Sequence, residues 1–195
     1  MKKIIKYLFL LTGGSFILAS CNDFLDREPL DSVTPDNFFF TENDLAAYAV
    51  KHYNFTTHEG FNAGIWKNDN ATDNQAATDY DKKWIPGQWK VPEAYDNPAS
   101  NDPWYFSAIR EANYFLETVV PRFEKGEIEG SETNIKHYIG EMYFLRAKNY
   151  LSKLETFGDF PIIKNTLPDE SASLIQASKR EPRHKVARFI LEDLD

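Results

Sequence analysis

Apolar residues recur at helical spacing near the start and in the second half of the chain, and the stretch between these parts has no clear period. Thr41 with Asp44 three residues later is typical of a helix start, because each side chain can bond the other's backbone amide. The residues that continue this pattern at helical spacing are Leu45, Tyr48, Ala49 and His52. We therefore expect a first short helix after Thr41.

A longer helix is predicted to begin at Asp102, which can cap it, with Pro103 in the first helical position and Pro121 ending the helix. Its apolar face comprises Trp104, Ala108, Ile109, Ala112, Phe115, Leu116 and Val119. A polar connection at 124–132 leads to another helix within residues 133–157, so the two are expected to pack as an antiparallel hairpin. Such hairpins build tetratricopeptide-like solenoids, although the full repeat pattern is not present here.

The helix expected within residues 133–157 has a stripe that faces the core. The stripe consists of Ile139, Tyr143, Arg146, Tyr150, Leu154 and Phe157. Gly158 is placed to end this helix in a left-handed conformation, with Pro161 soon after it. Because Arg146 lies on the apolar stripe, we expect it to form a structural ion pair rather than to contact a ligand.

A last apolar stripe lies near the end of the chain and comprises Val186, Phe189, Ile190 and Leu194. The chain stops at Asp195, so Asp193 and Asp195 lie at the negative end of the expected helix dipole, which is unfavourable. A helix with an exposed apolar face also needs a partner. From this pattern we expect a fragment of a longer protein or a truncated gene product.

The stretch between the first and second predicted helices, residues 59–102, is rich in Asn, Asp, Gly and Pro and contains Trp66, Trp84 and Trp89. Irregular segments of this length are usually functional or disordered. The aromatic content argues against disorder. We therefore expect a long irregular loop insertion in an otherwise all-α chain.

The first twenty residues have the pattern of a secretory signal, in which a basic head precedes an apolar stretch at residues 7–19. That stretch is shorter than the roughly 20 apolar residues that cross a bilayer, so a transmembrane helix is the weaker interpretation. Residues 18–20 resemble a bacterial lipobox, and Cys21 would become the lipidated first residue of a mature domain, 21–195. The alternative is a free thiol near an ordinary cleavage site.

Acidic and amide side chains follow Cys21 at Asn22, Asp23 and Asp26. This pattern resembles the signal with which some Gram-negative lineages send lipoproteins to the outer face of the outer membrane. Two or more acyl chains hold a protein on a membrane, whereas one chain gives only marginal binding. The predicted location is therefore the cell outer membrane, with a lipid anchor and the protein facing the exterior.

The charge of the chain excludes nucleic acid as a partner class. The formal net charge is -8, and removing residues 1–20 takes away three lysines and no acid, which leaves -11. Such a surface repels phosphate backbones and anionic lipids. With one cysteine the chain forms no intramolecular disulfide, so its stability must come from an apolar core.

Other chemistry is poorly supported, and we predict no catalytic residue, metal or cofactor. The four histidines lack one-face ligand spacing, and most of them are expected at surfaces or edges: His52, His58, His137 and His184. Residues 69–81 are rich in oxygen ligands but lack the glycine and final glutamate of an EF-hand, so a solvated loop is favoured over a calcium site. No pair of carboxylates is placed by the sequence for glycoside hydrolysis.

Ordered motifs cover almost the whole chain. They are the lipobox at Cys21, FLDREP at 24–29, Trp104 with IREAN at 109–113, GEMYFLRA at 140–147 with Tyr150, FGDFPII at 157–163, and Val186 with FILEDLD at 189–195. With these motifs the chain resembles the N-terminal part of the SusD/RagB family of surface lipoproteins. Members of that family are typically several hundred residues long, so the resemblance covers only their first part.

The resemblance implies an all-α fold of tetratricopeptide-like helical hairpins with an irregular part that builds the ligand site. It also implies a lid-like role over a SusC-type TonB-dependent outer-membrane transporter and the capture of nutrients, usually glycans. The alternative function is that of a helical adaptor, or of a peptide-binding lipoprotein for nutrient uptake, without glycan binding.

Glycan binding requires flat aromatic rings for the C–H faces of sugars and polar side chains for the hydroxyl groups. In the resembling family the loop before the Trp104 motif commonly contributes such contacts. The candidate ligand residues in this loop are Trp84, Trp89, Tyr95, Asn97 and Asn101. The alternative is that Trp84 or Trp89 folds inward and fixes the loop to the helices.

Overall fold

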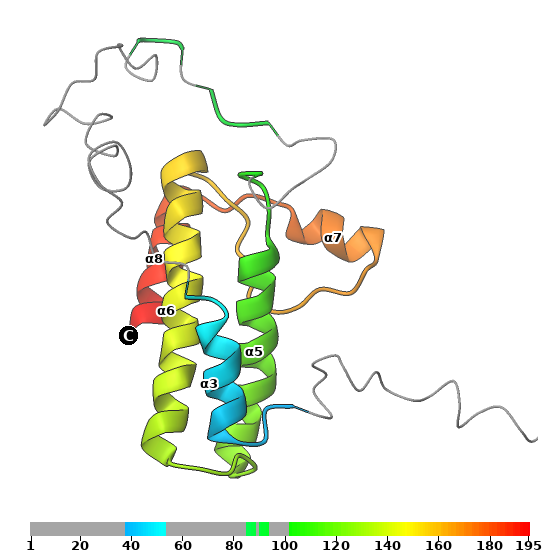
Figure 1. The fold of residues 1–195 in the computed structure, drawn as a ribbon. Coiled ribbons are helices and arrows are strands. Elements are labelled where there is room, and N and C mark those ends of the chain that lie inside the picture. Colours follow the sequence, from blue (N-terminus) through cyan, green and yellow to red (C-terminus); the bar gives the residue numbers. More distant parts are fainter. Residues whose placement is uncertain (1–37, 54–84, 89, 94–101) are drawn as a thin grey trace, which may run out of the picture. The chain divides into compact units, whose positions relative to one another are not determined.

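The computed structural model describes residues 38–53, 85–88, 90–93 and 102–195. These residues form the helices α3 (Glu42–Val50), α5 (Ser107–Lys125), α6 (Glu132–Phe157), α7 (Ser171–Ala177) and α8 (Arg183–Leu194), and no strand is present among them (Figure 1). The predicted all-α fold class is thereby confirmed, and the tetratricopeptide-like form of the hairpin stays a prediction. Within the same ranges no helix has the length and hydropathy needed to span a membrane. The predicted signal, 1–20, and most of the predicted loop, 59–102, lie outside the described residues.

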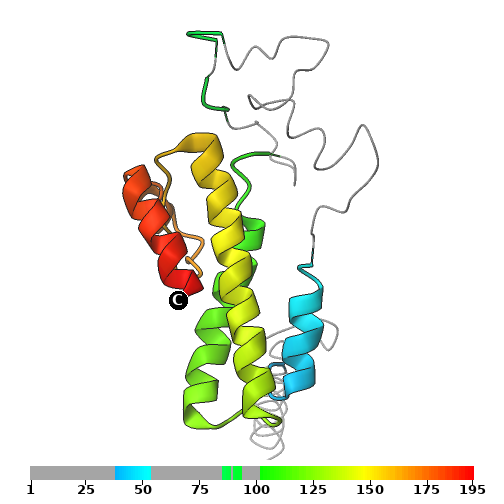
Figure 2. The same cartoon turned by 90° about the vertical axis from the view of Figure 1, so that its left-hand side faces the viewer.

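The centre of the fold is α6, which packs against α3, α5 and α8. Helices α5 and α6 run antiparallel and are joined by a short connection, as predicted (Figure 1). Helices α3 and α8 lie on either side of this hairpin (Figure 2). Three of the described helices, two before α6 in the chain and one after it, therefore pack on this central helix.

Helix α3 begins with the capping box that the sequence predicts. The amide of Asp44 donates to Oγ1 of Thr41 at 3.2 Å, and the amide of Thr41 donates to Oδ2 of Asp44 at 3.0 Å. The face of α3 that packs on the hairpin contains the buried residues Leu45, Tyr48 and Ala49. The helix is short, so its position depends on this packing.

Both predicted ends of α5 are wrong. The carboxylate of Asp102 accepts from the amide of Trp104 at 2.8 Å and so stabilises a turn, and the helix begins only at Ser107. Pro121 lies inside the helix, which continues to Lys125. An interior proline removes one backbone hydrogen bond and costs about 3 kcal/mol. The packing of Val119 and Phe123 on the core offsets this cost.

The connection between α5 and α6 is fastened to the residues before α3. Gly126 ends α5 in the left-handed conformation, with φ of 70°. The amide of Glu129 donates to the carbonyl of Phe40 at 2.8 Å, and the amide of Glu42 donates to the carbonyl of Glu129 at 2.9 Å. Gly130 has φ of 135°, and a Cβ there would lie 2.7 Å from the Glu42 carboxylate. The connection that was predicted only to be polar is therefore packed against the start of α3.

The apolar core forms two clusters. The first core cluster joins α3 to the middle of α5 and to the N-terminal half of α6. It consists of Phe39, Leu45, Tyr48, Ala49, Ala112, Phe115, Leu116, Val119, Ile128, Ile135, Met142 and Leu145. The second core cluster joins α5, α6 and α8 and consists of Ile109, Ala147, Tyr150, Phe157, Phe160, Val186, Phe189 and Ile190. These clusters include most of the residues predicted to face the core.

The last part of the chain differs from the prediction in two ways. Helix α7 was not predicted, because none of its residues is buried. In α8 the expected stripe is buried at Val186, Phe189 and Ile190, but Leu194 is 53% exposed and Asp193 is buried instead. Helix α6 ends before Gly158 as predicted, but Gly158 has φ of 72° and ψ of -96°, which is not the left-handed helical conformation that was expected.

Candidate functional site

All five predicted ligand residues lie outside the described part of the chain. This holds for Trp84, Trp89, Tyr95, Asn97 and Asn101. The predicted lipidation residue, Cys21, and the oxygen-rich segment 69–81 also lie outside it. What the structure describes is the framework that borders the candidate loop.

One described part of the candidate loop is fastened to the second core cluster through Trp104. The indole Nε1 of Trp104 donates to the carbonyl of Pro92 at 2.8 Å. The Trp104 ring lies 4.1 Å from the ring of Phe157 and 5.6 Å from that of Phe160, centroid to centroid. The guanidinium of Arg180 lies 4.8 Å from the centre of the indole. Trp104 therefore connects Pro92 to the end of α6.

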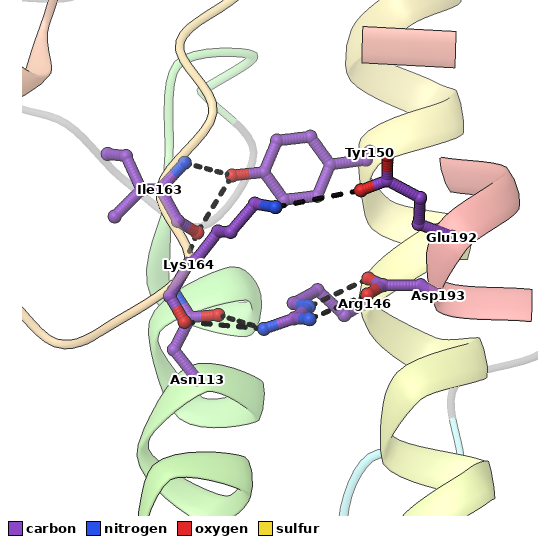
Figure 3. A network of polar contacts seen from close by, with 7 residues as sticks. All are labelled: Asn113, Arg146, Tyr150, Ile163, Lys164, Glu192 and Asp193. Carbon is purple, nitrogen blue, oxygen red and sulfur yellow. Dashed lines mark hydrogen bonds and ion pairs between the residues drawn. The ribbon is translucent and has the colours of Figure 1, made fainter. Parts of the chain in front are cut away.

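Beside this cluster lies a buried ion pair between α6 and α8 (Figure 3). Nε of Arg146 donates to Oδ2 of Asp193 at 2.7 Å, and Nη2 donates to Oδ1 at 2.6 Å. The two side chains are only 6% and 4% exposed. This two-point geometry offsets the cost of removing both charges from water. The prediction that Arg146 forms a structural ion pair is confirmed.

The same network holds the segment that follows α6 (Figure 3). Nη1 of Arg146 donates to Oδ1 of Asn113 at 2.8 Å, and Nδ2 of Asn113 donates to the carbonyl of Ile163 at 2.8 Å. The hydroxyl of Tyr150 donates to that carbonyl at 3.1 Å and accepts from the amide of Ile163 at 2.8 Å. Burial raises the pKa of Tyr150 to about 12, so its hydroxyl keeps the proton that it donates.

Four of the motifs noted in the sequence meet in this network. Asn113 comes from IREAN, Arg146 from GEMYFLRA, Ile163 from FGDFPII and Asp193 from FILEDLD. Every polar group involved is used within the protein. The network is therefore a structural clamp that positions α8 and residues 160–165, and it leaves the ligand site to other residues.

A separate cavity of about 420 Å³ opens where the end of α3 meets α5 and α6. Its apolar lining comes from Ala108, Ala112, Met142 and Leu145. Its polar lining comes from Lys51, His52, Lys148, Asn149 and Ser152. We call this space the His52 cavity. Its mixed lining is typical of small-molecule sites, which are mostly apolar with a few polar groups.

His52 is half-buried just after the end of α3. Its side chain is 11% exposed, and its Nδ1 lies 3.3 Å from Oε2 of Glu111. Burial lowers the pKa of His52, Lys51 lowers it further and Glu111 raises it, with burial the largest effect. The Nε2 atom is buried without a hydrogen-bond partner. The sequence places His52 on the same helical spacing as Leu45 and Tyr48, but its contact with Glu111 depends on the packing of α5 beside α3.

Among the residues that the structure describes, no group of three or more His, Cys, Asp or Glu side chains could hold a metal ion. His137 is exposed and pairs with Glu141 one turn away, with Nε2 2.9 Å from Oε1. His58 lies outside the described ranges.

Comparison with known proteins places this helical chain in a family. A family model for SusD-like proteins, described as starch-binding and associating with the outer membrane, matches residues 23–194. The chain belongs to the SusD-like family, since this match covers most of its length. The predicted family resemblance is thereby confirmed.

A curated relative supports the same assignment. The chain is 26% identical over 183 residues to SusD-like protein P2 of Formosa agariphila, and the alignment covers 91% of this chain and 34% of that protein. The chain thus spans about a third of the length of the relative. No solved structure matches the chain.

Proposed function

We propose that this protein binds glycans at the outer membrane and passes them to a SusC-type TonB-dependent transporter. The observation that carries the proposal is the family match over residues 23–194, whose description names starch binding and outer-membrane association. The structural clamp supports the family assignment on which this proposal depends, because four of the motifs that resemble the family are joined by its hydrogen bonds. The protein is a binding protein and not an enzyme in this proposal.

The proposed glycan site is the aromatic loop with Trp84, Trp89, Tyr95, Asn97 and Asn101. The aromatic rings would support the C–H faces of sugar rings, and the amides would bond their hydroxyl groups. The fastening of Pro92 by Trp104 supports this placement, because a binding loop needs a rigid base.

Replacing both Trp84 and Trp89 by alanine is expected to weaken glycan binding about tenfold or more, since each ring contributes about 1 kcal/mol beyond its burial. The measurement is native affinity electrophoresis of the full chain in soluble starch, xylan and polygalacturonate, followed by calorimetry with oligosaccharides of the polymer that retards it. Trp66→Ala in the same loop is the matched control. Unchanged affinity of the double variant would show that these tryptophans do not form the glycan site. A wild-type chain that binds no glycan would favour the adaptor or peptide-binding alternative.

The proposed membrane attachment is a lipid on Cys21, after removal of residues 1–20 as a signal. The acids at Asp23 and Asp26 support an outward-facing location, as does the family description. A lipid anchor of two or more chains holds the protein while the domain moves over a transporter.

Cys21→Ala is expected to abolish incorporation of a labelled fatty acid and to leave residues 1–20 attached, because the acceptor thiol is lost. Intact mass of the protein extracted from membranes measures both effects at once. Ser20→Ala keeps a small residue before the cysteine and should be processed and lipidated like the wild type. Acylation of the Cys21→Ala variant would show that the anchor lies elsewhere.

A further inference from the structure

The His52 cavity has an apolar wall of a kind that can support one face of a ring. Ala108 and Ala112 lie one turn apart on α5, and Met142 and Leu145 line the same cavity from α6. Met142 and Leu145 are buried in the first core cluster, so this wall is rigid. Its size falls within the range of about 300–1,000 Å³ that is usual for small-molecule sites.

Several polar atoms in the lining of the cavity form no hydrogen bond within the described part of the chain. Because the Glu111 carboxylate faces Nδ1 of His52, the ring proton resides on Nδ1 and Nε2 is a hydrogen-bond acceptor without a partner. Nδ2 of Asn149 donates to the carbonyl of Leu145 at 2.8 Å, so Asn149 offers its Oδ1 acceptor. Ser152 adds a hydroxyl that can accept or donate.

Ammonium groups are also present at the cavity. Lys51 lies 3.5 Å from Oε2 of Glu111 and is 64% exposed, so its other N–H groups are available to a ligand. Lys148 lines the cavity from α6. The lining thus combines an apolar wall, several acceptors and charged donors within one space.

We propose that the His52 cavity is a binding subsite for one sugar residue of a glycan. A sugar ring has an apolar C–H face for the Ala108 and Met142 wall, and its hydroxyl groups can donate to His52 Nε2 and Asn149 Oδ1. A purely apolar ligand would leave the buried Nε2 of His52 without a partner, which is costly. This inference rests on the proposed glycan-binding function and adds a second contact region, on the helices, to the aromatic loop.

Filling the cavity tests the proposal directly. Ala108→Phe places a ring in the cavity from an exposed helical position and is expected to weaken glycan binding about tenfold. Ala172→Phe makes the same exposed helical substitution on α7, away from the cavity, and should bind like the wild type. The probes are oligosaccharides of starch, xylan and polygalacturonate, measured by calorimetry with the full chain. Circular dichroism confirms that both variants fold.

A second pair of variants separates binding from structure. His52→Asn keeps a donor toward Glu111 but removes the Nε2 acceptor, and about tenfold weaker binding is expected. His52→Gln can place its Oε1 where Nε2 lies, so it should stay within about threefold of the wild type. A purely structural role of His52 would affect folding in both variants without this difference in affinity.

The outcomes distinguish the two proposals. If the wild type binds a probe and Ala108→Phe binds it equally well, the subsite is wrong and glycan binding by the loop stands. If the wild type binds none of the three probes, both the function and the subsite are overturned. Weaker binding by Ala108→Phe and His52→Asn, with Ala172→Phe unchanged, supports the subsite.

Discussion

Replacing Asp193 by alanine is expected to lower the free energy of unfolding by about 3–5 kcal/mol, because it leaves the buried Arg146 guanidinium without its counter-ion. The loss extends beyond one pair, since Arg146 also positions Asn113, which holds the carbonyl of Ile163. We expect α8 and residues 160–165 to loosen together. Urea denaturation of the full chain, followed by circular dichroism, measures the change.

The neighbouring residue provides a matched control. Glu192→Ala removes a carboxylate from the same turn of α8, but its pair with Lys164 is long, 3.6 Å, and more than half exposed on both sides. Such surface pairs contribute about 0–1 kcal/mol. The double variant Arg146→Met with Asp193→Leu should recover most of the stability, because it leaves no buried charge unpaired. Equal losses for Asp193→Ala and Glu192→Ala would contradict the structural role of the clamp.

Local sequence signals predicted much of this fold. The capping box at Thr41 and the stripe through Tyr150 depend on neighbours within a few residues; the capping box is confirmed, and the stripe residues are buried or packed against the core. The glycine after Phe157 ends α6, although not in the left-handed helical conformation. An arginine on an apolar stripe predicted that Arg146 would need an acidic partner. The all-α class follows from these signals, since period and caps are local properties.

The errors arise where a distant contact decides the outcome. Asp193 lies 47 positions from Arg146, so the sequence suggested only an unfavourable acid at a helix end. Pro121 signalled a helix end, but tertiary packing of Phe123 carries α5 past it. His52 became a candidate ligand residue only when α5 placed Glu111 beside it. None of these pairings leaves a periodic pattern in the sequence.

The candidate ligand site was located by a different kind of inference. Periodicity marked residues 59–102 as irregular, and only the chemistry of sugar recognition singled out Trp84 and Trp89 within them. Both residues stay predictions, whereas the structure adds the fastening of Pro92 and the His52 cavity. The conformation of a loop depends on many weak contacts. The residue types in a loop therefore predict its function better than its conformation.

Replacing Phe160 by alanine is the other change with a large expected effect, a loss of about 3–5 kcal/mol in the free energy of unfolding. Phe160 is fully buried, and its ring lies 5.1 Å from that of Phe106 and 5.2 Å from that of Phe157. Its backbone also pairs with that of Glu181, just before α8. The cavity left by the ring would therefore disturb three parts of the chain, and chemical denaturation should measure the loss.

Phe144→Ala is the matched control, because this phenylalanine on α6 is 45% exposed and should cost far less. A comparable loss for both variants would contradict the assignment of Phe160 to the second core cluster. The change at Phe160 also has a functional consequence, because Trp104 rests on Phe160 and holds Pro92. If the loop binds glycans from this base, Phe160→Ala should weaken glycan affinity even at temperatures where the chain stays folded, whereas Phe144→Ala should not.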